Sequence, residues 1–257
     1  MMMLDTELIA ALGAAERVVI LTGAGVSAES GVPTVRESQT GAWREYDPKD
    51  LATPQGFARN SRLVWEWYAW RRQLMQKARP NLAHYGLVDL EQHIPQFLLI
   101  TQNIDGLHWA AGSRDMIELH GNIARTRCAD DGIAVDSWED TGEVPPRCPH
   151  CGGALRPDVV WFGEGIASQV LDQAAAAIQS CDLFICLGTP AVVAPAATFP
   201  LLAKRHGAKV VDINPQPSAS SVVADWTVRG RCVDAIPALI RALAIPAYAL
   251  QAAEDNL

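Results

Sequence analysis

Four short apolar runs are spaced along the chain, covering residues 18–21, 97–101, 183–187 and 209–213. They are apolar at nearly every position rather than at every second one. This pattern is typical of parallel strands that are covered on both faces of a sheet. We therefore predict a strand over each of these stretches.

Segments of helical composition lie between and around these runs. They cover residues 168–179, 200–206 and 234–244, and an amphipathic helix is predicted within residues 1–16. Gly207 suits the end of the second of these helices. Alternation of buried strands with helices predicts a doubly wound α/β fold, a Rossmann-like parallel sheet.

Two stretches interrupt this alternation. Residues 43–80 show no strand pattern and contain an aromatic-rich helical segment, residues 62–78, stopped by Pro80. Residues 125–157 are polar and contain proline, glycine and cysteine. We predict that both are insertions forming a small second domain. The Rossmann-like domain would then consist of residues 1–42, 81–124 and 158–257.

Composition limits the class of protein. The 257 residues are 49% hydrophobic and 19% charged, with a formal net charge of −8. This balance indicates a globular chain with a sizeable core. An acidic chain without a Lys/Arg cluster is a poor candidate for nucleic-acid binding, although it would tolerate a basic peptide.

Residues 183–203 form an uncharged stretch long enough to span a membrane. Gly188, Pro190, Pro195 and Pro200 interrupt it, so we expect a strand, a loop and a new helix instead. The start of the chain does not resemble a secretory signal. We expect a cytoplasmic protein without disulfides, acting as a monomer.

The first predicted strand leads directly into a glycine-rich turn. Residues 22–28 read TGAGVSA, which gives G-x-G-x-x-A after a strand, a place where backbone amides can bind a pyrophosphate. Alone this signal is weak, because no second predicted strand leads to an acidic partner for the ribose.

Longer motifs carry more information. Residues 23–36 (GAGVSAESGVPTVR) closely resemble the NAD-binding signature of sirtuins, and residues 101–108 (TQNIDGLH) resemble their second signature. Residues 118–121 (ELHG) are similar to the catalytic-base motif of that family. Two late nucleotide motifs follow in the family's order, at residues 188–189 (GT) and 213–215 (INP). Together these similarities cover nearly the whole chain.

The resemblance implies a fold and an activity. A sirtuin combines a Rossmann-like NAD domain with a small domain made of a zinc-ribbon-like module and a helical module, which agrees with the two insertions. It implies NAD-dependent removal of acyl groups from the lysines of proteins or peptides. The products would be nicotinamide, free lysine and O-acyl-ADP-ribose.

Roles for individual residues also follow from the resemblance. His120 would be the catalytic base, a task suited to a group that titrates near neutrality. Asn103 and Asp105 would lie beside the nicotinamide ribose and carboxamide. The full set of expected NAD contacts is Gly23, Ala24, Gly25, Ser27, Ala28, Thr34, Val35, Arg36, Trp43, Gln102, Asn103, Ile104, Asp105, Gly188, Thr189, Asn214 and Cys232.

Tyr68 and Arg71 lie three residues apart, so on a helix they project from the same side. A phenol and a guanidinium can bind a carboxylate together. The pair resembles that of the sirtuins that remove succinyl, malonyl and glutaryl groups, and acetyl-lysine would remain a substrate. The alternative is an aromatic core stripe beside a solvated arginine.

A second substrate contact follows from residues 158–164 (DVVWFGE), which look like the family segment that pairs with the substrate backbone as a strand. The expected contacts are Val160, Trp161, Phe162, Gly163 and Glu164.

A structural zinc ion is expected, although its ligand set departs from the family pattern. Cys148 and Cys151 form a C-x-x-C pair, and Asp131 stands where a second cysteine would follow Cys128. Zinc accepts a carboxylate as one of four ligands. His150 as a substitute ligand and a metal-free loop remain alternatives.

Two further departures concern NAD. Val35 replaces a phenylalanine that covers the reacting ribose in sirtuins, so we expect weaker coupling of NAD cleavage to deacylation. Pro190 replaces a serine next to a phosphate contact. An ADP-ribosyltransferase or NAD hydrolase on the same scaffold is therefore the alternative function.

Overall fold

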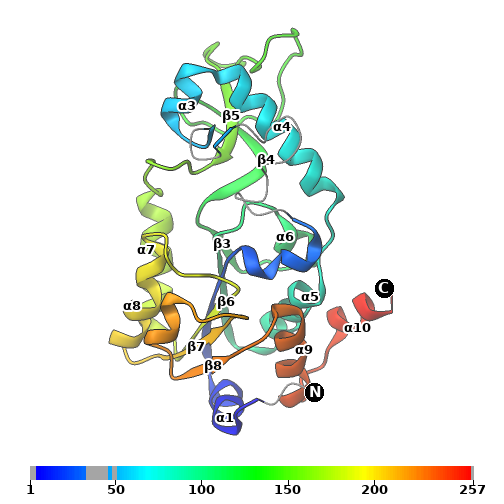
Figure 1. Ribbon diagram of the computed structural model, residues 1–257, viewed down its shortest axis with the longest axis vertical. Helices are drawn as coiled ribbons and strands as arrows, with labels where there is room; N and C mark the ends of the chain where they lie inside the picture. Colours follow the sequence, from blue (N-terminus) through cyan, green and yellow to red (C-terminus); the bar gives the residue numbers. More distant parts are fainter. Residues whose placement is uncertain (1–3, 33–45, 48–50, 256–257) are drawn as a thin grey trace.

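The computed structural model describes residues 4–32, 46–47 and 51–255 (Figure 1). Its centre is a six-stranded sheet in the order β3-β2-β1-β6-β7-β8, in which all neighbouring strands are parallel. The strands are β1 (Arg17–Thr22), β2 (Gln96–Thr101), β3 (Met116–Glu118), β6 (Leu183–Leu187), β7 (Lys209–Ile213) and β8 (Trp226–Val228). The predicted Rossmann-like parallel sheet is confirmed.

Helices cover both faces of the sheet (Figure 1). They are α1 (Thr6–Ala14), α5 (Leu82–His93), α6 (Leu107–Ala111), α7 (Ser168–Ser180), α8 (Phe199–Arg205), α9 (Cys232–Ala242) and α10 (Tyr248–Glu254). α7, α8 and α9 lie within two residues of the helices predicted from the sequence. None of the described helices is both long and apolar enough to cross a membrane.

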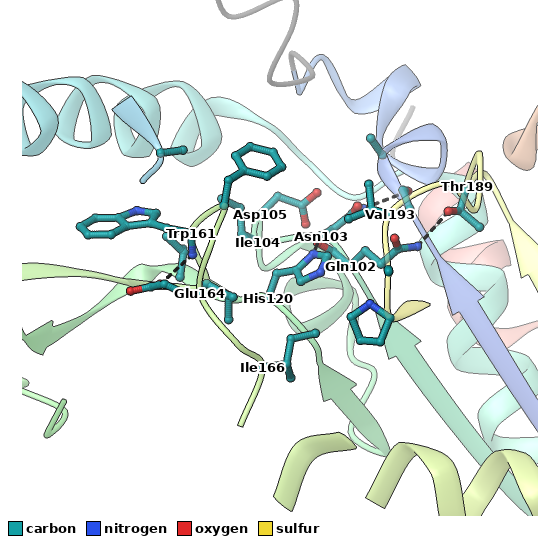
Figure 2. Close-up of a pocket in the computed structure, with 18 of the residues that line it drawn as sticks. Gln102, Asn103, Ile104, Asp105, His120, Trp161, Glu164, Ile166, Thr189 and Val193 are labelled. Atoms are coloured by element: carbon teal, nitrogen blue, oxygen red, sulfur yellow. Dashed lines mark hydrogen bonds between the residues drawn. The ribbon is translucent and has the colours of Figure 1, made fainter. Parts of the chain in front are cut away.

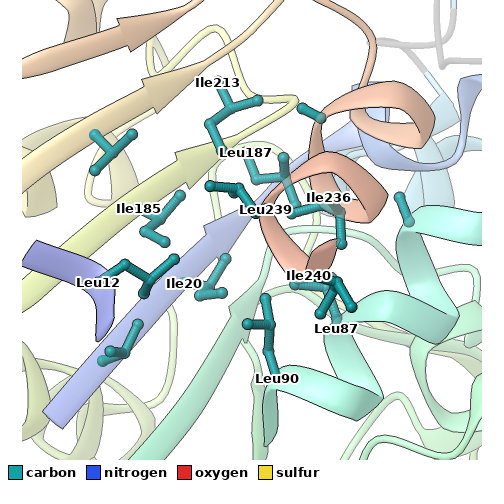
Figure 3. Close-up of a cluster of buried hydrophobic side chains, with 14 of the residues drawn as sticks. Leu12, Ile20, Leu87, Leu90, Ile185, Leu187, Ile213, Ile236, Leu239 and Ile240 are labelled. Carbon is teal, nitrogen blue, oxygen red and sulfur yellow. The ribbon is translucent and has the colours of Figure 1, made fainter. Parts of the chain in front are cut away.

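Alternate residues of β1 serve opposite faces of the sheet. Val18 and Ile20 pack into the core formed with α5 and α9, whereas Val19 and Leu21 pack into the core formed with α7 and α8. Figure 3 shows Ile20 in the first core, close to side chains from α5 and α9. Because both faces are buried, apolar residues occupy every position, which produces the continuous runs in the sequence.

A smaller part lies at one end of the molecule, at the top of Figure 1. It contains α3 (Pro54–Arg59), α4 (Ser61–Lys77) and an antiparallel pair, β4 (Gly121–Cys128) and β5 (Leu155–Val159). The expected domain limits at residues 124 and 157 fall inside β4 and β5, so these strands pass from one predicted domain to the other. The division into two domains stays a prediction.

Candidate active site

A cavity of about 750 Å³ opens where the carboxyl ends of β1, β2 and β6 meet the smaller part (Figure 2). Ligands commonly bind at this edge of a doubly wound sheet. Sixteen of the expected site residues line it: Gly23, Ala24, Ser27, Tyr68, Arg71, Gln102, Asn103, Ile104, Asp105, His120, Val160, Trp161, Phe162, Gly163, Glu164 and Thr189.

The glycines of the turn after β1 are needed for contact with the loop after β6. A Cβ atom on Gly25 would lie 2.7 Å from the carbonyl oxygen of Gly188, and one on Gly23 would lie 2.7 Å from Cβ of Thr189. The Gly25 amide donates to that same Gly188 carbonyl at 2.8 Å. Gly23 has an extended backbone, with φ of −136°. Its lack of a side chain therefore permits close packing rather than a left-handed turn.

Ser27 joins several polar groups at the floor of the cavity. Its hydroxyl donates to Asp105 Oδ2 at 2.8 Å and accepts from Asn103 Nδ2 at 3.2 Å. His84 Nδ1 accepts from the Asn81 amide, so Nε2 carries the proton and faces Ser27 Oγ at 3.3 Å. Burial lowers the pKa of His84 to about 4, which keeps this ring neutral.

The side chain of Asn103 can offer an acceptor to a ligand. Its Nδ2 also donates to the Gly23 carbonyl at 3.1 Å, so both amide hydrogens are used, and Oδ1 accepts from none of the described residues. Asp105 accepts from the Leu107 amide at 2.9 Å. Burial raises the pKa of Asp105 against the hydrogen bonds that lower it.

His120 is held as a neutral ring in one tautomer. Its Nδ1 lies 2.9 Å from the carbonyl oxygen of Gln102. A carbonyl can only accept, so Nδ1 carries the proton and Nε2 keeps its lone pair. Burial lowers the pKa of His120, although the bond to Gln102 opposes this. Gln102 itself donates to Thr189 Oγ1 at 2.8 Å, a bond visible in Figure 2.

Tyr68 and Arg71, both on α4, are buried at the other end of the cavity. Tyr68 is 2% exposed and Arg71 4% exposed. The sequence-based alternative of a solvated arginine is therefore wrong. Burial raises the pKa of Tyr68 to about 12, so the phenol is protonated at neutral pH. Its oxygen accepts from Trp161 Nε1 at 3.1 Å.

Several backbone amides of residues 160–164 are already hydrogen-bonded within the chain. The amide of Val160 donates to the backbone carbonyl of His120, and that of Phe162 donates to the Ala52 carbonyl, both at 2.9 Å. The Trp161 amide donates to the Glu164 side chain. The segment is therefore a loop after β5, and its pairing with substrate as a strand stays a prediction.

Other expected NAD contacts lie outside the lining of the cavity. Cys232 is buried behind Gly188, within 2.9 Å of the position of a Cβ there. Asn214 donates to the fully buried Asp212 at 2.5 Å. That carboxylate also accepts from Ser218, Ser220, Ser221 and Arg229. It fixes the loop after β7, from which Asn214 projects.

Gly25, Ala28 and Gly188 likewise lie outside the cavity lining. Thr34, Val35, Arg36 and Trp43 lie outside the described residues.

Sequence reasoning missed several apolar residues of the cavity. They are Val32, Ala52, Met75, Val159, Ile166, Leu171, Val193, Ala194 and Pro195, together with Gly165. Val32 and Val159 lie inside the motifs of residues 23–36 and 158–164, but no motif marks the others, because small and aliphatic side chains occur throughout the chain. Only the fold shows which of them face the cavity.

The four expected metal ligands lie together. One ligand atom each from Cys128, Asp131, Cys148 and Cys151 can be chosen so that all four are within 4.8 Å of one another. A tetrahedral zinc ion with Zn–S bonds of about 2.3 Å needs sulfur atoms about 3.8 Å apart. The Sγ atoms of Cys128 and Cys151, at 3.4 Å, suit this geometry. His150 is not a member of the group, and these residues fit a structural zinc ion.

Comparisons with known proteins agree with this geometry. The sequence model of the Sir2 family matches residues 23–195. An NAD-dependent protein deacylase of Aeropyrum pernix is 48% identical over 227 residues, covering 88% of this chain and 92% of that relative.

Two solved structures extend the similarity to the fold. A Sir2 homologue in complex with NAD is 41% identical with a TM-score of 0.87, covering 97% of this chain and 96% of that one. A Sir2 protein with a deacetylated p53 peptide and 3'-O-acetyl ADP-ribose is 31% identical with a TM-score of 0.81, covering 95% and 100%. The sirtuin resemblance is thereby confirmed, and this chain belongs to the Sir2 family.

Proposed function

We propose that this chain removes acyl groups from protein lysines in an NAD-dependent reaction, and that it favours acyl groups ending in a carboxylate. The first part is supported by relatives that are NAD-dependent protein deacylases. A Sir2 structure that holds a deacetylated peptide supports acyl-lysine peptides as the partner. The preference for acidic acyl groups depends on Arg71.

Arg71 is a buried cation without an acidic partner among the described residues. Its guanidinium lies 4.9 Å from the ring centroid of Trp67 and 6.0 Å from that of Tyr68. Aromatic faces attract a cation, but they compensate only part of the cost of taking it out of water. A ligand carboxylate in the cavity would supply the missing charge.

Tyr68 complements Arg71 as a neutral donor. Because its oxygen accepts from Trp161, its own hydrogen is available to a ligand. Ala52 lines the same cavity and carries only a methyl group, which leaves room for an acyl chain longer than acetyl. A guanidinium, a phenol and free volume together suit a succinyl, malonyl or glutaryl group.

The residues around His120 suit the chemistry on NAD. When bound, NAD supplies the ribose carbon that takes up the acyl oxygen as nicotinamide leaves. We assign to His120 Nε2 the removal of a proton from a ribose hydroxyl, which requires the neutral tautomer set by Gln102. The free Oδ1 of Asn103 would accept from a ribose hydroxyl, and Asp105 would orient the nicotinamide end.

One lysine peptide carrying acetyl, succinyl, malonyl or glutaryl tests the proposal. Each form is incubated with NAD, and the peptide and nucleotide products are identified by mass spectrometry, with His120→Ala as control. We expect O-acyl-ADP-ribose from each form and the highest kcat/KM with the acidic groups. Nicotinamide release without deacylation would instead support an ADP-ribosyltransferase or NAD hydrolase. Loss of acetyl alone would contradict the acidic preference.

A further inference from the structure

A cluster of charged and aromatic side chains lies behind the acyl end of the cavity. The carboxylate of Glu164 accepts a hydrogen bond from each of the two terminal nitrogens of Arg156, at 2.5 and 2.9 Å. It also accepts the backbone amide of Trp161 at 2.8 Å, a bond drawn in Figure 2. Glu164 lines the cavity, yet these bonds commit its carboxylate to the protein.

The ion pair holds the indole of Trp161 in one orientation. The Arg156 guanidinium lies 3.3 Å from the ring centroid of Trp161. The rings of Phe57 and Tyr68 lie 5.2 and 6.4 Å from Trp161. With its ring held between these groups and 3% exposed, Trp161 has little freedom to rotate.

This fixed indole determines what Tyr68 can offer a ligand. A phenol oxygen can both donate and accept, whereas an indole nitrogen only donates. The 3.1 Å bond from Trp161 Nε1 therefore occupies an acceptor position of Tyr68. The phenol hydrogen must then be directed elsewhere, and the cavity that Tyr68 lines is where a ligand could accept it.

We propose that Trp161 is a positioning residue for acyl selectivity, which acts by orienting the Tyr68 hydroxyl toward the acyl carboxylate. Arg156 and Glu164 support it by holding the indole in place. This inference rests on the proposed preference for acidic acyl groups. It assigns to the side chain of Trp161 a role that is separate from backbone pairing with the substrate.

A purely structural role for Trp161 predicts a different outcome. As a core side chain, it would affect acetyl and succinyl substrates equally when changed. As a positioning residue, it would affect mainly the succinyl substrate, and mainly through KM. Trp161→Phe separates the two, because it keeps an aromatic ring and removes only the N–H donor and part of the ring area.

The test compares kcat/KM for succinyl and acetyl forms of one peptide in wild type, Trp161→Phe, Tyr68→Phe and the double variant. Loss of one hydrogen bond to a charged carboxylate, worth about 1.5–3 kcal/mol, corresponds to roughly 10- to 150-fold. We expect each single variant to lower the succinyl-to-acetyl ratio by about that factor. We expect the double variant to lower it no further, because both changes act on the same bond, from the Tyr68 hydroxyl to the acyl carboxylate.

Trp65→Phe is the matched control, since it makes the same substitution on α4 at a ring that packs against Trp138 and has no contact with Tyr68 among the ring pairs of the described residues. Its ratio should stay within about twofold of wild type. If turnover is lost in any variant, calorimetric binding of the succinyl and acetyl peptides provides the same ratio. An unchanged ratio in Trp161→Phe, or multiplicative effects in the double variant, would overturn the inference.

Arg71→Met distinguishes failure of this inference from failure of the proposed function. If Arg71→Met lowers the ratio and Trp161→Phe does not, the carboxylate preference stands and the role of Trp161 is wrong. If wild type shows no preference for the succinyl peptide, both ideas are wrong.

Discussion

Replacing Arg71 by methionine is the most direct perturbation of the proposed acyl site. Methionine has a similar length and fills the same buried space, but it carries no charge and no donors. Since Arg71 has no acidic partner among the described residues, the change should leave no carboxylate of that part of the chain unpaired. The effect on activity should therefore report the loss of a contact to the substrate.

The magnitude follows from the kind of bond that would be lost. A hydrogen bond to a charged group contributes about 1.5–3 kcal/mol. At about 1.36 kcal/mol per factor of ten, this corresponds to roughly 10- to 150-fold. We expect kcat/KM for the succinyl peptide to fall by that factor relative to the acetyl peptide. Because the interaction binds the substrate before and during the reaction, most of the change should appear in KM.

The same substitution should not destabilise the free protein. Burial lowers the pKa of Arg71, which shows that the charged form is disfavoured where it lies. An uncompensated buried charge is costly, so its replacement by an apolar side chain of similar volume should be neutral or stabilising. For a chain of this size, a gain of about 1 kcal/mol raises Tm by about 2–4 °C.

Arg72 is the matched control on the same helix. It donates to the carbonyls of Ile123 and Arg125 and to Thr126 Oγ1. Arg72→Met should therefore lower Tm by several degrees and leave the succinyl-to-acetyl ratio unchanged. The assay pairs steady-state kinetics with thermal unfolding. Equal loss of both activities in Arg71→Met, together with a lower Tm, would refute the reasoning.

Four further predictions concern other parts of the site. Because burial lowers the pKa of His120 and only the neutral ring is a base, kcat/KM should fall with acid through a midpoint below 6.5; a midpoint above 6.5 would contradict this. Ala52→Phe should fill the acyl pocket and lower kcat/KM for the succinyl peptide at least tenfold, and an unchanged value would show that the chain does not pass Ala52. Asp131→Cys should raise zinc affinity in a chelator competition, because zinc prefers thiolate; equal affinity would count against Asp131 as a ligand. Asp212→Asn should raise KM for NAD about tenfold without changing KM for the peptide. A similar rise in both KM values would indicate a general folding defect.

The main strands could be predicted because burial on both faces leaves a simple signal. β1, β2, β6 and β7 are apolar almost throughout, and the sequence marks each of them. The edge strands β3 and β8 have only three residues each, too few to form a recognisable run. Their position depends on parallel pairing with β2 and β7, which is a tertiary property.

The residues expected to bind the nucleotide and to act as base lie in contiguous motifs, and for this reason the sequence could mark many of the residues that line the cavity. Asn103 and Asp105 occupy one short loop after β2, and their relation to Ser27 follows from adjacent parallel strands. His84 had no such motif, although it bonds to Ser27. It approaches from α5, and its contact depends on how that helix packs on the sheet.

The acyl end shows why sequence spacing could not decide between the two interpretations of Tyr68 and Arg71. One is a carboxylate site at Tyr68 and Arg71, and the other is an aromatic core stripe of Trp67, Trp70 and Leu74 beside a solvated arginine. They differ in whether Arg71 reaches solvent, and that depends on what packs around its side of the helix. In the structure Arg71 is enclosed, and among the described residues it faces a cavity rather than an acid. A buried charge without an opposite charge beside it is a cost to stability. A ligand carboxylate would offset that cost, and this is why burial, more than the motif, supports the function proposed for Arg71.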